Sequence, residues 1–141
     1  VGVSVVNALS EVLELDIWRN GQHYFMRFRH GVPEAPLSVT GPAGDNKGTR
    51  VRFLPSAETF KITTFNRATI EHRLRELAFL NSGVRIVLRD ERPDSEYEVT
   101  LYFEGGLTEF VKYVDRAKNT LHPHPIILKT TVDGIGIEMA L

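Results

Sequence analysis

Apolar and polar residues alternate along several short runs of this 141-residue chain, and such alternation predicts β-strands. Two of these runs, residues 11–19 and 22–30, are separated by the pair Asn20-Gly21. Both residues of an Asn-Gly pair tolerate positive φ angles, so the pair predicts a tight hairpin turn. In the first run every second residue from Leu13 to Ile17 is apolar, so we expect one face of the hairpin to belong to a core.

Three segments show helical periodicity instead. Residues 4–10 are apolar nearly all round, which is typical of a helix buried inside a domain. Asn66 is a suitable N-cap for a longer helix that runs to about Leu80, and Gly83 lies just past its end. A third helix is predicted after Gly105-Gly106. The expected apolar stripes of these last two helices are Ile70, Leu74, Leu77 and Ala78, and then Leu107, Phe110, Val111 and Val114.

The remaining segments are predicted to be one long loop and further strands. Three prolines place the loop at residues 31–47, with at most a short strand near 37–40. Further strands are expected at residues 49–54, 84–89, 98–103, 126–131 and 135–141. The order of elements indicates an α+β fold with helices on one face of a largely antiparallel sheet. A domain boundary is expected near Gly105-Gly106, and the second domain is expected to be incomplete because its strands have no obvious partner elsewhere.

Composition narrows the classes of function. The net charge is −1, which gives no support for a chain that clamps nucleic acid by bulk electrostatics. The chain has no cysteine, which excludes disulfides and thiolate metal sites and suits a reducing cytoplasm. No apolar run approaches the roughly 20 residues that span a bilayer, and no signal peptide is visible. The composition is therefore that of an ordinary globular protein.

The first residues, Val1-Gly2-Val3, lead directly into the first predicted helix, and no initiator methionine precedes them. Backbone N–H groups at a helix start are unpaired, and a glycine lets an anion approach them closely. We therefore expect the downstream part of a nucleotide site here, with its upstream part missing from the chain. The alternative is an ordinary junction between a loop and a helix.

Several motifs occur in an order found in one family. They are Val1-Gly2-Val3-Ser4-Val5-Val6-Asn7-Ala8-Leu9-Ser10, His30-Gly31-Val32-Pro33, Gly48-Thr49-Arg50-Val51-Arg52-Phe53, Arg73-Leu74-Arg75-Glu76-Leu77-Ala78-Phe79-Leu80-Asn81-Ser82-Gly83, Tyr102-Phe103-Glu104-Gly105-Gly106 and Asp133-Gly134-Ile135-Gly136. With them the whole chain resembles the ATPase region of the DNA gyrase B protein, in the type IIA topoisomerase family. The resemblance implies the rear part of a GHKL (Bergerat) ATPase α/β sandwich at residues 1–103. The beginning of a ribosomal S5-like transducer domain would follow at residues 104–141.

The resemblance also implies an activity and partners. Members of this family hydrolyse ATP with Mg²⁺ and introduce negative supercoils into double-stranded DNA. Two B subunits close like a gate and act with gyrase A subunits, and coumarin-type inhibitors bind the B subunit. The catalytic glutamate, the magnesium-binding asparagine and the adenine-reading aspartate are expected upstream of Val1, and the γ-phosphate lysine beyond Leu141. The parent protein would be a cytoplasmic topoisomerase, and this chain alone is expected to be inactive.

The family's phosphate contacts fall on the start of the chain. Backbone N–H groups of Val1, Gly2 and Val3 would face the triphosphate, and the Val3 side chain would line the pocket. Asn7 would hydrogen-bond the loop that carries the phosphates. A lone asparagine in an apolar helix needs some partner, so a purely structural role for Asn7 is an open alternative.

Adenine and inhibitor contacts fall on two strands. Thr49 would help to hold the adenine through a bridging water, and Val51 would pack against the base. Both residues are also expected to face a core. Arg19, just before the hairpin turn, would contact coumarin-type inhibitors, whereas by itself it would be interpreted as a solvated arginine at a strand end.

Two further patterns carry less chemistry. His122 and His124 resemble a metal pair, but two donors in a proline-bound loop make a poor site without further ligands. Basic residues alternate at Arg27, Arg29, Arg50 and Arg52. Acidic residues lie among them, so a solvated sheet face is favoured over contacts with a phosphate backbone.

Two alternative functions remain open at this point. The corresponding subunit of topoisomerase IV, which decatenates DNA, is the nearest one, although the stretch from Leu74 to Gly83 resembles gyrase more. The other is a non-catalytic interaction module in which the opening glycine only turns the chain. Binding of a nucleotide analogue would separate the module from the enzyme.

Overall fold

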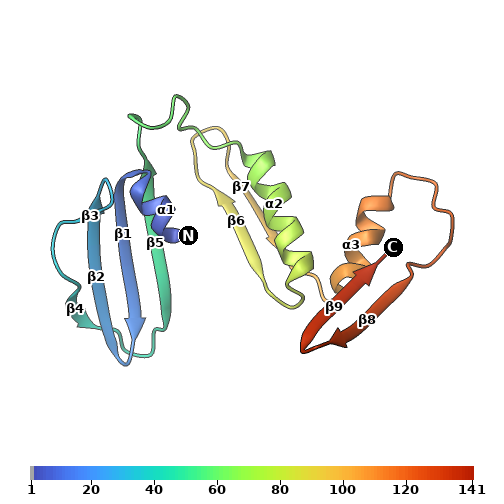
Figure 1. Ribbon diagram of the computed structural model, residues 1–141. Coiled ribbons are helices and arrows are strands. Elements are labelled where there is room, and N and C mark those ends of the chain that lie inside the picture. Colours follow the sequence, from blue (N-terminus) through green and yellow to red (C-terminus); the bar gives the residue numbers. More distant parts are fainter. Residues whose placement is uncertain (1) are drawn as a thin grey trace. The chain divides into compact units, whose positions relative to one another are not determined.

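The computed structural model describes residues 2–141 and forms two compact units, one ending at Thr64 and one spanning Phe65–Leu141. The first unit contains the helix α1 (Val3–Ala8) and five strands (Figure 1). These strands are β1 (Ser10–Arg19), β2 (Gln22–Arg29), β3 (Val32–Pro33), β4 (Ser38–Pro42) and β5 (Gly48–Pro55). They form one sheet in the order β3-β2-β1-β5, and β4 pairs with β2. All these pairings are antiparallel.

The hairpin between β1 and β2 confirms the prediction from the Asn-Gly pair. Asn20 and Gly21 have φ angles of 54° and 72°, the positive values that a two-residue hairpin turn with the strands' natural twist requires. The register runs from Arg19 opposite Gln22 to Val12 opposite Arg29. On the other side of β1, the pairing with β5 shifts once, between Ser10 and Val12.

The two faces of this sheet differ in chemistry. Leu13, Leu15 and Ile17 of β1 lie opposite Phe53, Val51 and Thr49 of β5, and we call this side the apolar face. Asp16 and Glu14 lie opposite Arg50 and Arg52 on the other side, which we call the polar face. Leu13 is only 2% exposed, in agreement with the expected core side of the hairpin.

Helix α1 departs from the expectation of a buried helix. None of its residues is buried among the described part of the chain, and Val3 and Val5 are 57% and 46% exposed. The helix contacts the beginning of β1, and its end lies against Gly31, where an added Cβ would come within 3.3 Å of the Ala8 Cα. One side of a six-residue helix is thus covered, while its apolar composition alone suggested contacts all round.

The second unit combines two helices with two hairpins (Figure 1). Its elements are α2 (Arg67–Leu80), β6 (Ile86–Asp90), β7 (Tyr97–Leu101), α3 (Gly106–Asp115), β8 (Ile127–Val132) and β9 (Ile135–Ala140). Helix α2 begins as predicted, since the Asn66 side chain accepts a hydrogen bond of 3.0 Å from the Thr69 N–H. Strands β8 and β9, for which no partner was expected elsewhere, pair with each other around Asp133-Gly134.

The core of the second unit lies between α2, the end of β7 and α3. Phe79 and Ala78 are buried, and so is Leu101 at the end of β7. Leu77, expected on the apolar stripe, is instead 49% exposed. The buried side of α2 is displaced toward Phe79 because that ring stacks on the ring of Phe103. Phe103 lies outside α2, so the periodicity of α2 alone does not predict this contact. Since α3 also packs on α2, this compact unit spans residue 103, and the domain boundary at 103/104 stays a prediction.

Among the described residues, no helix is both long and apolar enough to cross a membrane.

Candidate functional site

The start of α1 has the conformation that a glycine permits. Gly2 has φ 79° and ψ −121°, where a side chain would be strained although no atom outside its neighbours lies within 4 Å of an added Cβ. Its carbonyl accepts hydrogen bonds from the N–H groups of Val5 and Val6, at 3.0 and 3.1 Å. No side chain caps this helix start, and Val3 is exposed. The predicted contact at Val1 lies outside the described residues.

Of the two polar atoms of the Asn7 side chain, only Nδ2 has a partner among the described residues. Its Nδ2 lies 3.5 Å from the carbonyl oxygen of Gly31, the distance of a weak hydrogen bond. Its Oδ1 is buried and has no hydrogen-bond partner among the described residues. Asn7 therefore links α1 to the turn after β2 and leaves one acceptor free for a further donor.

Three of the predicted site residues lie on the apolar face of the first sheet. Thr49 and Val51 are opposite Ile17 and Leu15, so they project to the same side of β5. Arg19 ends β1 two residues after Ile17, and alternation places it on that side too. Thr49 is exposed and Val51 is 40% exposed, so the expectation that both are covered by a core is wrong among the described residues. Around Thr49 and Val51 the apolar face is therefore exposed among the described residues, whereas Leu13 further along β1 is buried.

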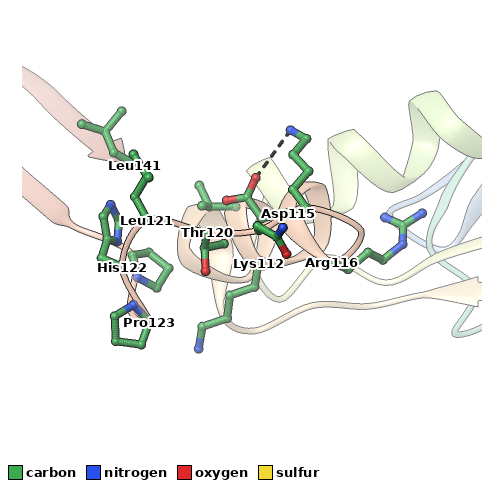
Figure 2. A pocket seen from close by; sticks show the side chains of 12 residues that line it. Lys112, Asp115, Arg116, Thr120, Leu121, His122, Pro123 and Leu141 are labelled. Carbon is green, nitrogen blue, oxygen red and sulfur yellow. Dashed lines mark hydrogen bonds and ion pairs between the residues drawn. The ribbon is translucent and has the colours of Figure 1, made fainter.

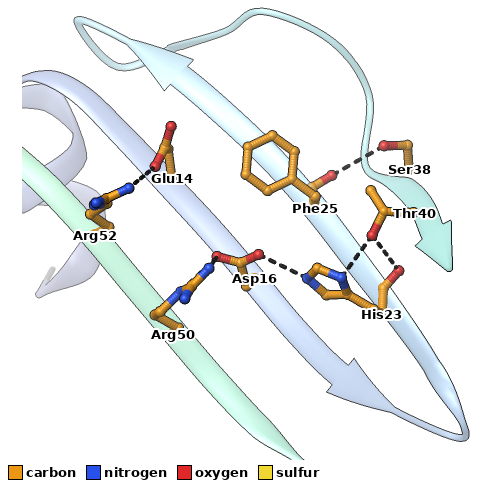
Figure 3. A network of polar contacts seen from close by, with 8 residues as sticks. All are labelled: Glu14, Asp16, His23, Phe25, Ser38, Thr40, Arg50 and Arg52. Carbon is orange, nitrogen blue, oxygen red and sulfur yellow. Dashed lines mark hydrogen bonds and ion pairs between the residues drawn. The ribbon is translucent and has the colours of Figure 1, made fainter. Parts of the chain in front are cut away.

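The polar face contains a buried carboxylate, Asp16, which the sequence pattern does not indicate (Figure 3). Asp16 is 4% exposed, although it alternates with apolar neighbours as a surface residue would. Arg50 donates two hydrogen bonds to its Oδ2, and His23 Nε2 lies 2.8 Å from its Oδ1. Burial raises the pKa of Asp16, but the hydrogen bonds and charges of Arg50 and His23 outweigh it and leave the pKa below its usual value.

The alternating arginines of the polar face are paired with acids of the same sheet. Arg52 Nη1 lies 3.4 Å from Glu14 Oε2, and Arg29 Nε lies 2.9 Å from Glu34 Oε1. Arg27 lies between both glutamates, at 3.7 and 3.6 Å. These pairs favour the interpretation of a solvated sheet face over that of a surface for phosphate backbones.

The histidines of the second unit show no metal geometry. Among the described residues no group of three or more potential ligands exists, and His122 Nδ1 lies 2.7 Å from the carbonyl oxygen of His124. Figure 2 shows His122 at the edge of a cavity of about 350 Å³ between the end of α3 and the following loop. Its lining includes Lys112 and Arg116, and Lys118 pairs with Asp115 at 3.5 Å.

Comparison with known proteins gives relatives along the whole chain. The DNA gyrase B proteins of Rickettsia conorii (strain ATCC VR-613 / Malish 7) and Caulobacter vibrioides (strain NA1000 / CB15N) are 55% and 48% identical to it. That of Synechocystis sp. (strain ATCC 27184 / PCC 6803 / Kazusa) is 44% identical. Each match covers 100% of this chain but only 18%, 19% and 13% of the relative, so the chain spans less than a fifth of their length. No family model matches the chain.

Solved structures that share the fold include two gyrase B proteins. The 43K ATPase domain of Thermus thermophilus gyrase B, in complex with an aminocoumarin, has a TM-score of 0.85 and 34% sequence identity. The match covers 97% of this chain and 37% of that one. The B-subunit of the DNA gyrase from Myxococcus xanthus has a TM-score of 0.83 and 29% identity, with 98% and 40% covered. The fold is therefore that of the gyrase B ATPase region.

Proposed function

Because the chain corresponds along its whole length to a segment of the DNA gyrase B family, we propose that it forms part of the ATP-binding component of a type II topoisomerase. The parent protein would use ATP hydrolysis to introduce negative supercoils into double-stranded DNA. The observation that carries the proposal is the similarity of 97% of the chain to the 43K ATPase domain, at a TM-score of 0.85.

This segment would contribute binding rather than the catalytic step. Its start would offer backbone N–H groups of Val1, Gly2 and Val3 to the phosphates of ATP. The positive φ angle of Gly2 and the uncapped, exposed beginning of α1 support this role. The residue that holds Mg²⁺ and the general base would come from chain upstream of Val1, so the segment by itself would not hydrolyse ATP.

The apolar face would receive the adenine. Val51 would pack on the base, and the hydroxyl of Thr49 would help to hold its edge through water. Support comes from the register of β1 and β5, which places both residues and Arg19 on one side of the sheet. Arg19 would contact coumarin-type inhibitors. The aminocoumarin in the Thermus thermophilus complex supports that class of ligand.

The wider assembly follows from the same family. A second B subunit, the gyrase A subunit and DNA would bind through parts of the parent protein outside this chain, in the cytoplasm. Residues 1–103 would belong to the ATPase domain and residues 104–141 to the transducer. The Gly105-Gly106 junction would pass the closure of the ATP site to the transducer.

Titration with a nucleotide tests the proposal. A polypeptide extended upstream of Val1 to the complete ATPase region should bind a non-hydrolysable ATP analogue tightly and only with Mg²⁺. Gly2→Val should abolish this binding, because valine disfavours the φ angle of 79°. Gly134→Val is the matched control, since Gly134 has a φ angle of 78° in the β8–β9 turn and equally open surroundings. Its binding should be unchanged.

Two results would contradict the proposal. An extended polypeptide that is folded but binds no ATP analogue would support an interaction module instead. Full binding by the Gly2→Val variant would refute the assignment of the phosphate contacts. For the full-length parent protein with the gyrase A protein added, supercoiling of relaxed DNA distinguishes a gyrase from a topoisomerase IV, which would only relax or decatenate.

A further inference from the structure

Asp16 is held from both sides by side chains of neighbouring strands. Its Oδ2 accepts hydrogen bonds of 3.0 and 2.8 Å from Nε and Nη2 of Arg50, on β5. Its Oδ1 lies 2.8 Å from Nε2 of His23, on β2. Asp16 is the one buried charged residue among those described. A buried carboxylate without a partner strongly destabilises the folded state, so these hydrogen bonds constrain the positions of both neighbouring strands.

The contacts continue across the sheet beyond these three residues. His23 Nδ1 lies 2.8 Å from the hydroxyl of Thr40 on β4, as Figure 3 shows. Trp18 stacks on the His23 ring with 4.8 Å between ring centroids and 6° between planes. The Arg50 guanidinium lies 5.5 Å from the centroid of the Trp18 ring. One row of polar contacts thus joins β5, β1, β2 and β4, and the indole ring packs beside it.

Arg50 connects this row to the opposite face of the sheet. It lies between Thr49 and Val51 in the sequence, and its side chain leaves β5 on the polar face while theirs leave on the apolar face. Among the described strands β5 has one neighbour, β1. The ladder of backbone hydrogen bonds with β1 and side-chain contacts to β1 therefore both help to fix its position. The charged pair with Asp16 is the shortest of these that the polar face provides.

We propose that Asp16 is a positioning residue for nucleobase recognition: by holding Arg50 it fixes the part of β5 that presents Thr49 and Val51 to the adenine. This inference rests on the proposed function, because it needs the adenine to bind on the apolar face. The inference goes beyond the proposed function because it assigns a role to Asp16 and Arg50, whose side chains lie on the polar face and cannot touch the nucleotide. Loss of Asp16 should therefore reduce the difference in affinity between nucleobases, and it should change the affinity for the triphosphate much less.

A matched pair on the same face provides the control. Glu14 and Arg52 repeat the arrangement two residues along each strand, but their contact is 3.4 Å long and single. The Glu14 side chain is 23% exposed, against 6% for that of Asp16. Arg52 adjoins Val51 but lies three residues from Thr49, and its weak, exposed pair with Glu14 should affect stability at most slightly.

The experiment uses the full-length gyrase B protein and measures dissociation constants for a non-hydrolysable ATP analogue and its inosine counterpart, which lacks the 6-amino group. Asp16→Asn and Arg50→Gln should each lower the preference for the adenine nucleotide by about two- to tenfold, the equivalent of one hydrogen bond. Glu14→Gln should leave the preference unchanged. Arg50→Gln replaces a side chain that is largely exposed. This variant therefore tests the proposal by itself if Asp16→Asn fails to fold.

A double-mutant cycle separates positioning from general stability. In a Thr49→Ala background, which already lacks the hydroxyl, Asp16→Asn should cause no further loss of preference. The proposal is overturned if folded Asp16→Asn or Arg50→Gln keeps the full preference, or if the loss persists undiminished without the Thr49 hydroxyl. An equal loss in Glu14→Gln would overturn it as well. Absence of ATP binding by the unsubstituted protein would instead refute the proposed function.

Discussion

The ring of Phe79, near the end of α2, stacks on the ring of Phe103 with 3.7 Å between centroids and 16° between planes. The rings of Phe110 and Tyr113, both on α3, lie 5.3 Å from Phe79. Phe79 is 1% exposed, so nearly all of its surface is buried in this aromatic cluster. The cluster joins α2, the segment after β7 and α3 into one compact unit.

Removal of the Phe79 ring should therefore strongly destabilise the folded protein. Phe79→Ala is expected to lower the free energy of unfolding by about 3–5 kcal/mol, through lost apolar burial and the cavity that remains. Denaturant titration monitored by circular dichroism measures this change. Leu80→Ala is the control, because Leu80 is 56% exposed on the same helix and its loss should stay below about 1 kcal/mol. Equal effects of both substitutions would contradict the described core.

The N-cap of α2 provides a milder test. Asn66 Oδ1 accepts hydrogen bonds from the N–H and the hydroxyl of Thr69, at 3.0 and 3.2 Å. Asn66→Ala should cost about 1 kcal/mol of stability, since the first turn loses its partner. Asn66→Asp should retain the native stability because its carboxylate can accept the same bonds. If alanine and aspartate behave alike in thermal unfolding, the side chain does not cap the helix.

The lowered pKa of the Asp90 carboxyl group predicts that the stability of the protein depends on pH. Hydrogen bonds from the Arg92 side chain, at 2.6 and 2.8 Å, are the main cause that lowers its pKa from 3.8 to about 2. A lowered pKa in the folded state stabilises the protein above about pH 4, and this contribution is lost as the pH falls toward 2. Titration of the carboxyl carbon by NMR measures the pKa. In Arg92→Gln it should return toward 3.8, and an unchanged value would exclude the ion pair as the cause.

The β1–β2 turn should be sensitive to a methyl group. Gly21 has a φ angle of 72°, so Gly21→Ala is expected to destabilise the protein by about 1–2 kcal/mol. Gly41, in β4, is a glycine without a positive φ angle and with no atom within 4 Å of an added Cβ. Gly41→Ala should therefore leave the melting temperature unchanged or raise it slightly. A larger loss at Gly41 than at Gly21 would be inconsistent with the hairpin geometry.

Much of the candidate site was predictable because it depends on neighbours in sequence. Alternation placed Thr49 and Val51 on one side of a strand, and a glycine before an apolar run indicated the helix start at Gly2. That these residues contact a nucleotide stays a prediction. It came from the family resemblance, since neither a strand residue nor a lone glycine identifies a ligand by itself.

Contacts between distant residues were not predictable in the same way. Asp16 has the pattern of a surface carboxylate, and its burial depends on Arg50, which lies 34 residues further along the chain. Alternation gives the face of a side chain, but the register of β1 against β5 decides which charges meet. Likewise, Leu77 was expected in the core, whereas the aromatic residues around α3 turn the buried side of α2 toward Phe79.

The amino-acid sequence by itself determined the turn at Asn20-Gly21, the cap at Asn66, the order of the helices and strands except the short strand β3, and the family resemblance. Each of these depends on backbone preferences or hydrogen bonds within a few residues, or on a pattern read along the chain. Only the tertiary structure decided that α1 is covered on one side only, that Asp16 is enclosed and that Phe79 lies in the core of its unit. These outcomes depend on which surfaces meet after folding, and the free energy of such contacts belongs to pairs of distant residues rather than to any local pattern.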